Sequence, residues 1–250
     1  MLRCFFPLVA LAVSAAPNSL TAFEISPQTT QVLVGVAEGW NSSYVTLTLY
    51  ERGGLFGKKE GWKVAAGPWK GRLGYNGLVW GHGVHPKMSG TTKREGDGRS
   101  PAGVFLLGGA WGYEANVKSP KAQTYQQVTT RDLWYEDPNS PYYNQHRRIT
   151  HEPRTTEEKK AQMKQNDYPH SLKLFIRHNA EKGSIIPGAG SSIFFHIWRR
   201  GGAAATAGCT TIHESHMRSL IAKIDPARHP LYVLLPKAEY ERYREPWKLP

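Results

Sequence analysis

Alternation of apolar and polar residues marks several segments of this chain as strands with one buried face. Residues 44–50 read Tyr-Val-Thr-Leu-Thr-Leu-Tyr, and residues 31–36 before them are rich in valine. Two such runs in succession predict a hairpin. Four further apolar runs predict core strands at residues 104–107, 173–177, 192–197 and 231–235.

Helical periodicity is confined to short stretches. Near the C-terminus, four apolar residues recur at helical spacing: Met217, Leu220, Ile221 and Ile224. Ser215 is the predicted N-cap of this helix, and Pro226 is expected to end it. Residues 155–158 (Thr-Thr-Glu-Glu) resemble a second helix start, within a charged segment at 151–167. We expect that segment to be a solvated surface helix in a charged insertion at about residues 144–170.

The composition favours strands joined by turns over a helical bundle. The chain contains 8 Trp, 12 Tyr and 8 Phe among 25 Gly and 17 Pro. With 250 residues, 40% hydrophobic and 21% charged, it can bury one sizeable core. We predict a mainly β fold with a few short helices, in a single domain over residues 23–250.

The first 22 residues have the pattern of a secretory signal peptide. Arg3 precedes the apolar run 5–13, and small residues follow. This run is too short to span a bilayer, and no other apolar stretch approaches the roughly 20 residues that a span needs. We predict cleavage after Ala22 and export, with no membrane span afterwards. A buried N-terminal strand or helix is the alternative.

Cysteine use narrows the candidate chemistry. The chain has two cysteines, and Cys4 lies inside the predicted signal peptide, so Cys209 alone remains after cleavage. Exported proteins usually hold cysteines in disulfide pairs. A single thiol is therefore accidental, a partner for another chain, or a reactive centre.

The net charge of +12 favours polyanionic partners. The sequence contains no zinc-finger spacing and no aromatic RNA-binding signature, so we do not expect a nucleic-acid partner. For an exported protein, the remaining anionic partners are lipid and the carboxylate-rich peptides and polymers of the cell wall. General solubility is the alternative explanation of the charge.

The most informative chemical pattern joins the predicted strand 192–197 to the loop after it. His196 lies near the end of that strand, and Cys209 follows 13 residues later, beyond a Gly/Ala loop. A thiol needs a neighbouring base to react near neutral pH, and imidazole is the usual partner. The run Thr-Ala-Gly-Cys can turn tightly, so amide N–H groups near Gly208 and Cys209 can face a substrate carbonyl as an oxyanion hole.

These residues resemble the L,D-transpeptidase (YkuD-like) catalytic domain, whose members carry a His on one strand and a small-residue Gly-Cys turn downstream. Three further segments agree with the family: residues 96–105, 137–144 and 188–192. The resemblance covers residues 62–236. The chain departs from many members at Ala207, where they have His, and at Thr211, where they have Arg.

The resemblance implies an L,D-transpeptidase-type β-sandwich or barrel and acyl transfer on peptidoglycan stem peptides. Cys209 is then the nucleophile, His196 is its base, and Gly208 belongs to the oxyanion turn. The thiolate attacks the carbonyl between an L-configured centre and a terminal D-amino acid, which leaves as the thioester forms. An acceptor then resolves the thioester.

Three residues are predicted to bind the substrate: Arg99, Arg199 and Thr206. Guanidinium groups bind peptide carboxylates in bidentate geometry. Neither an organic cofactor nor a metal is implied. His82, His85 and Asp97 could suggest a zinc peptidase, but the helical His pair or Cys set of such a site is missing.

Three functional hypotheses remain open. If a diamino acid of another stem accepts the acyl group, a cross-link forms and the enzyme is a transpeptidase. If water accepts it, the enzyme is an L,D-carboxypeptidase. The third reading is a catalytically silent wall-binding protein, whose basic surface holds an anionic wall polymer and whose Cys209 is inert. We favour the transpeptidase, acting in the periplasm or cell wall.

Overall fold

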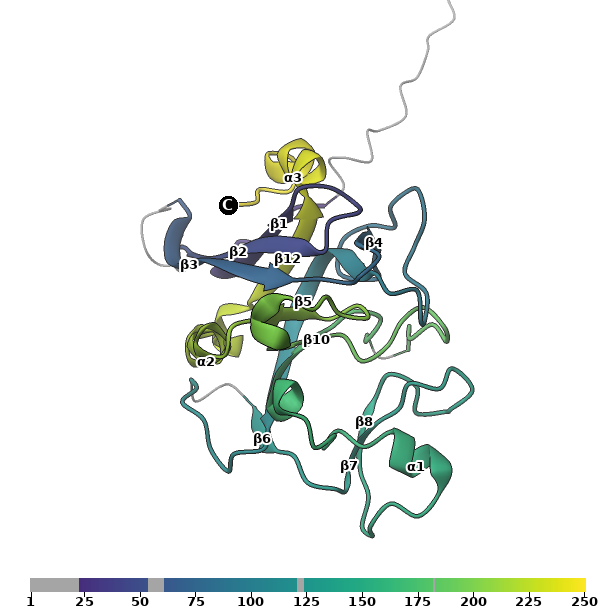
Figure 1. The fold of residues 1–250 in the computed structure, drawn as a ribbon. Coiled ribbons are helices and arrows are strands. Elements are labelled where there is room, and N and C mark those ends of the chain that lie inside the picture. Colours follow the sequence, from purple (N-terminus) through teal and green to yellow (C-terminus); the bar gives the residue numbers. More distant parts are fainter. Residues whose placement is uncertain (1–22, 54–60, 121–123, 182) are drawn as a thin grey trace, which may run out of the picture.

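The computed structural model describes residues 23–53, 61–120, 124–181 and 183–250 (Figure 1). The predicted signal peptide, residues 1–22, lies outside these ranges. Within the described part of the chain, no helix combines the length and the apolar character needed to cross a membrane.

The N-terminal strands form one side of a curved sheet. β1 (Gln31–Ala37) and β2 (Tyr44–Glu51) are the predicted antiparallel hairpin, and β3 (Lys63–Arg72) continues it on the far edge of β2. β12 (Leu231–Pro236) lies parallel to β1 on the opposite side. The predicted strands at both ends of the chain are therefore confirmed and adjacent.

A second group of strands follows β3 across the sheet. β11 (Thr210–Ile212) pairs antiparallel with β3, and β10 (Phe194–Ile197) runs parallel to β11. β9 (Leu172–Ile176) then pairs antiparallel with β10. The apolar runs predicted at 173–177 and 192–197 are thus neighbouring strands of the core.

One long strand closes the sheet into a barrel. β5 (Ser100–Gly112) pairs with β9 through residues 107–112 and with β12 through residues 103–106. Its first residues pair parallel with β4 (Leu78–Trp80), and its last with β6 (Tyr125–Gln127). The predicted mainly β fold of barrel type is confirmed.

Large apolar side chains with no more than 1% exposed surface fill the barrel, among them Leu33, Leu47, Phe105, Phe195 and Tyr232. α3 (Lys237–Arg244) lies against β1 and β12, at the top of Figure 1. Tyr243 of this helix stacks on Trp247, with ring centroids 4.2 Å apart. The 3-10 helix η4 (Pro226–Arg228) leads into β12.

The predicted C-terminal helix is α2 (Glu214–Lys223), and its apolar stripe faces the core as expected. The predicted N-cap was wrong. Ser215 lies inside the first turn, and His213 is the N-cap, because its non-helical backbone directs Nδ1 to accept the Ser215 N–H at 3.2 Å. The helix ends at Ile224, before the predicted stop at Pro226.

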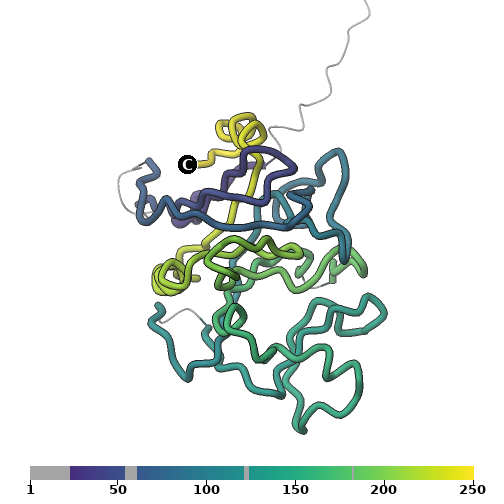
Figure 2. The backbone as a smooth tube through the Cα atoms, viewed as in Figure 1, coloured from purple at the N-terminus to yellow at the C-terminus, as the bar shows by residue number. Residues whose placement is uncertain are grey.

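A lobe formed by residues 113–120 and 124–171 lies below the barrel (Figures 1 and 2). It contains the small sheet of β7 (Asp132–Trp134) and β8 (His146–Arg148). An aromatic cluster joins the lobe to the strands above it: Trp134 of β7 packs on Trp111, Phe175 and Phe194.

The charged segment of the lobe is less helical than predicted. α1 (Thr156–Lys160) begins with the expected signal, because Thr155 and Glu158 form a capping box. The helix ends after five residues instead of spanning 151–167. The chain then turns inward, where Met163 is buried and donates its N–H to the Asp132 carbonyl at 2.9 Å.

Truncation inside the barrel should destabilise the protein. Leu234 has no exposed surface and packs over Gly35. Leu234→Ala should lower the free energy of unfolding by about 2–5 kcal/mol, because the cavity cannot collapse fully. Val64→Ala, on a side chain that is 60% exposed, should change it by less than about 0.5 kcal/mol. Urea denaturation of both variants measures the difference, and equal effects would contradict the described core.

Candidate active site

The parallel pair β10 and β11 brings the two predicted reactive residues together. His196 is in register with Thr211, and Cys209 directly precedes β11. Side chains two residues apart project to the same face of a strand, so Phe194 and His196 share one face. The Phe194 N–H donates to Cys209 Sγ at 3.5 Å. His196 and Cys209 both line a pocket of about 220 Å³.

The protonation state of His196 is set by its partner. Only 4% of the residue is exposed, and Nδ1 lies 2.9 Å from the carbonyl oxygen of Ile197. A carbonyl can only accept, so Nδ1 carries the hydrogen and Nε2 keeps a free lone pair. Burial lowers the pKa of His196 to about 3, and the neighbouring His170 adds to this effect. The imidazole is therefore neutral and able to accept a proton at Nε2.

Cys209 is also neutral in the resting protein. It is a free cysteine that keeps part of its surface exposed, and Sγ donates to the Ser192 carbonyl at 3.4 Å. Burial of the thiol raises its pKa to about 11, although the Phe194 N–H favours the thiolate. Thiol and imidazole thus face the same pocket as an uncharged pair.

The turn before Cys209 is held by two hydroxyl groups. Thr206 Oγ1 accepts the Gly208 N–H at 3.0 Å and donates to the Cys209 carbonyl at 2.7 Å. Ser100 Oγ donates to the Gly208 carbonyl at 2.8 Å. Gly208 has φ +154°, and a Cβ there would lie 3.0 Å from the Arg99 carbonyl oxygen. The residue predicted for the oxyanion turn therefore occupies a backbone position that favours glycine.

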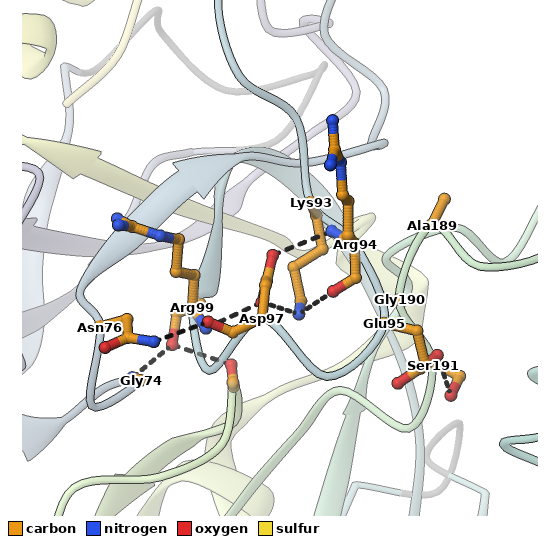
Figure 3. Close-up of polar contacts among 12 residues, drawn as sticks. Gly74, Asn76, Lys93, Arg94, Glu95, Asp97, Arg99, Ala189, Gly190 and Ser191 are labelled. Atoms are coloured by element: carbon orange, nitrogen blue, oxygen red, sulfur yellow. Dashed lines mark hydrogen bonds and ion pairs between the residues drawn. The ribbon is translucent and has the colours of Figure 1, made fainter.

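A buried ion pair holds the loop that precedes Ser100. Lys93, only 3% exposed, pairs with Asp97 (Figure 3). Asp97 Oδ1 also accepts the Arg99 N–H at 2.9 Å, and the Asp97 carbonyl accepts from Asn76. These contacts order the Gly-rich residues 96–99, which lead into β5. Through the bond from Ser100 to Gly208, the segment helps to position the turn before Cys209.

The predicted substrate-binding residues have different placements. Arg199 and Thr206 line the pocket of Cys209. The Arg199 guanidinium forms an ion pair with Asp167 of the lobe. Arg99 instead directs its guanidinium to a backbone carbonyl of β4 and lines a separate cavity of about 420 Å³. The structure does not bring that side chain to the thiol.

Sequence reasoning missed two residues at the site. His170 ends the lobe, in the 3-10 helix η2 (Tyr168–Ser171), and lines the pocket. Its ring packs against that of His196 in a tilted arrangement, with centroids 4.5 Å apart and an interplanar angle of 30°. No sequence signal identifies this contact. The 3-10 helix η3 (Arg200–Gly202) lies in the loop that leads from β10 toward the same pocket.

Lys173 is the second missed residue. It lies opposite His196 in the β9–β10 ladder, is 4% exposed, and donates Nζ to the Met163 carbonyl at 2.9 Å. Burial lowers its pKa to about 8, while the Cys209 thiolate would favour the ammonium form. The sequence did contain a signal for this residue, namely a lysine inside the apolar run of a core strand. Burying a charged group costs free energy unless the group is paired or hydrogen-bonded.

Metal ligation finds no support in the described part of the chain. No group of three or more His, Cys, Asp or Glu side chains there could hold a metal ion. His178, which is fully buried, accepts the His82 N–H and lies 2.9 Å from the Ala189 carbonyl. His82 therefore packs against a hydrogen-bonded core imidazole, and His85 packs on Trp80 and Phe105 and accepts the Val104 N–H.

The neutral thiol predicts a particular pH dependence of alkylation. Iodoacetamide reacts with thiolate, so the rate at Cys209 should rise roughly tenfold per pH unit from about pH 7 to about pH 10, without a plateau. Lys173→Met should slow the reaction further, because it removes a charge that favours thiolate. Mass spectrometry of the single adduct measures both rates. A plateau near neutral pH would show a preformed thiolate–imidazolium pair.

The hydroxyl of Thr206 should act on turnover. Thr206→Val removes both bonds to the nucleophile turn, each worth about 1 kcal/mol. We expect kcat to fall roughly tenfold with KM little changed, and Thr206→Ser to retain most activity. Steady-state kinetics separates the two parameters. If KM alone rises, the hydroxyl binds substrate instead.

Comparison with known proteins agrees with this geometry. The family model described as the L,D-transpeptidase catalytic domain, YkuD, matches residues 40–233. This span runs from the β1–β2 turn to β12 and includes both His196 and Cys209. No curated protein and no solved structure matches the chain. The chain therefore belongs to the YkuD family of L,D-transpeptidase-type enzymes, which act on peptidoglycan.

Proposed function

We propose that this enzyme forms peptidoglycan cross-links through a thioester on Cys209. The observation that carries the proposal is the single pocket that the neutral imidazole of His196, with its Nε2 lone pair free, shares with the thiol of Cys209. A positioned base beside a thiol is the arrangement of nucleophilic catalysis. The tautomer of His196 is already the one that accepts a proton from Sγ.

The first half-reaction is acylation. As Cys209 Sγ attacks the carbonyl of the donor stem peptide, its proton moves to Nε2 of His196. The C–N bond to the terminal D-amino acid then breaks, and the imidazolium returns the proton to the leaving amine. Because thiol and imidazole start neutral, charge develops only while substrate occupies the pocket. Lys173, opposite His196, favours that charge separation.

The oxyanion is stabilised at the turn. The Gly208 N–H is engaged with Thr206 Oγ1, so the Cys209 N–H is the donor that we assign to the developing negative oxygen. Ser100 and Thr206 hold the carbonyls of Gly208 and Cys209 and thereby fix the orientation of this turn. A preset donor of this kind is worth about 2.7–4 kcal/mol in other acyl-transfer enzymes.

Positive charge around the pocket suits an anionic peptide. Arg199 lines the pocket with its side chain 45% exposed, and Lys173 pairs with His196 in the neighbouring strand. A carboxylate of the stem peptide can compete with Asp167 for Arg199. The net charge of +12 favours approach to the wall as a whole. Arg99 is the weaker candidate, since it faces another cavity.

We favour cross-linking over hydrolysis and over a non-catalytic role in wall binding. The family match supports an enzyme over a silent wall-binding protein, and the family is named for L,D-transpeptidation. An L,D-carboxypeptidase would share the acylation step and differ only in the acceptor. We further propose that residues 1–22 direct export and that the mature enzyme acts in the periplasm or cell wall.

Mass spectrometry with a disaccharide tetrapeptide tests the proposal. We expect a thioester adduct on Cys209, followed by a cross-linked dimer. Cys209→Ser should keep the fold and lose the adduct, because a hydroxyl is a far poorer nucleophile with this base. His196→Gln should slow acylation by roughly 10²–10⁴-fold, the usual contribution of a general base.

Each other product has a defined meaning. Tripeptide without dimer would assign the enzyme as a carboxypeptidase. A folded protein that binds sacculi but forms no adduct and no product would support the wall-binding alternative. Val64→Ala, on an exposed side chain that does not line the pocket, serves as the matched control and should keep wild-type turnover.

A further inference from the structure

The pocket of Cys209 holds a second imidazole that the acylation step does not use. His170 comes from the lobe, lines the pocket, and packs against the ring of His196. Its side chain is 20% exposed, whereas His196 is only 4% exposed. A molecule entering the pocket therefore meets His170 on a more open side than His196.

Asp167 orients this second imidazole. His170 Nδ1 lies 2.8 Å from Asp167 Oδ1 and 3.0 Å from Oδ2. A carboxylate accepts, so Nδ1 carries the hydrogen and Nε2 presents a lone pair. Arg199 pairs with the same carboxylate and holds it in place. The arrangement of base and orienting acid matches that of catalytic His–Asp pairs.

The second half-reaction requires a proton acceptor. An acceptor amine must reach the thioester uncharged, and it loses a further proton as its nitrogen forms the new amide. A carboxylate-oriented imidazole is the stronger base of the two, because His196 is oriented only by a backbone carbonyl. The two rings are close enough that a proton on one disfavours a proton on the other.

We propose that His170, oriented by Asp167, is the general base for the acceptor amine, while His196 serves the thiol. This division of labour rests on the function proposed above. The acceptor is a primary amine that enters from the lobe side of the pocket. The lobe thus contributes a catalytic group to a barrel that already holds the nucleophile.

The proposed step balances in atoms and charge. The amine nitrogen forms a C–N bond to the thioester carbonyl, and the C–S bond breaks with its electron pair moving to Sγ. The amine proton moves to Nε2 of His170. The imidazolium then gives this proton to the regenerated thiolate, so that enzyme and imidazole return to their starting forms.

The groups around His170 keep it in the basic form. Burial lowers its pKa, and Lys173 of β9 and Arg199 lower it further. Asp167 opposes them and raises it. His196 of β10 faces the ring from the other side. Because the pKa is lowered, the ring is neutral at neutral pH, and transfer should be lost as the pH falls through that pKa.

The test separates the two half-reactions. His170→Asn places an amide nitrogen where Nδ1 stood, so it can keep the bond to Asp167 while Nε2 is lost. The matched control is His151→Gln, which removes another acid-paired histidine of the same lobe, 36% exposed and outside the pocket. Single-turnover mass spectrometry follows adduct formation on Cys209 and its resolution by an amine-bearing acceptor peptide.

We expect acylation in His170→Asn within about threefold of wild type and resolution slower by roughly 10²–10⁴-fold, so the thioester accumulates. Hydroxylamine, which needs no base at neutral pH, should resolve the thioester equally fast in both proteins. The His151→Gln variant should resemble wild type. If acylation and resolution fall together, or if neither falls, the assignment is wrong.

Asp167→Asn supplies an independent readout and carries the test if His170→Asn fails to fold. It removes the group that raises the pKa of His170, so the acid limb of the resolution rate should move to lower pH. An unmoved limb would overturn the proposal. Absence of any adduct in the wild-type protein would instead refute the thioester function itself, so the two failures are distinguishable.

Discussion

Closure of the barrel by β5 is the constraint on which the site depends. One strand pairs with β4 at its start, β12 in its middle and β9 toward its end. Its first residue, Ser100, also bonds to the carbonyl of Gly208. The same strand therefore joins the ends of the sheet and supports the turn before Cys209, while the pairing of β10 with β11 keeps His196 next to the strand that follows this turn.

Desolvation acts on the reactive pair in opposite directions. It raises the pKa of Cys209 and lowers that of His196, and both changes favour the uncharged forms. Oxidants and electrophiles react with thiolate far faster than with thiol. A neutral pair is thus less reactive toward oxidants, and Lys173 offsets part of the effect of burial when charge develops on Cys209.

Much of the fold followed from local patterns, whereas the site did so only in part. Alternation and apolar runs predicted the hairpin and core strands, because side chains in a strand repeat with period two. His196 and Cys209 could be named because strand, loop and cysteine are close in sequence. Lys173 and His170 could not, since their contacts depend on strand order and on the path of the lobe. The direction in which the Arg99 side chain points depends on the backbone conformation of the loop 97–99, which the sequence pattern does not specify.

The lobe returns to the barrel through η2, which leads directly into β9. The number of residues at this junction therefore sets which side chains of β9 face Cys209. Lys173 reaches that face only in the present pairing with His196. A slip of one residue would turn Lys173 into the barrel core and place Leu172 or Leu174 on the face of Cys209. The exposed parts of the lobe are therefore free to lengthen or shorten, but the last turn before β9 is not. Insertions and deletions should therefore be tolerated around α1 but not between η2 and β9.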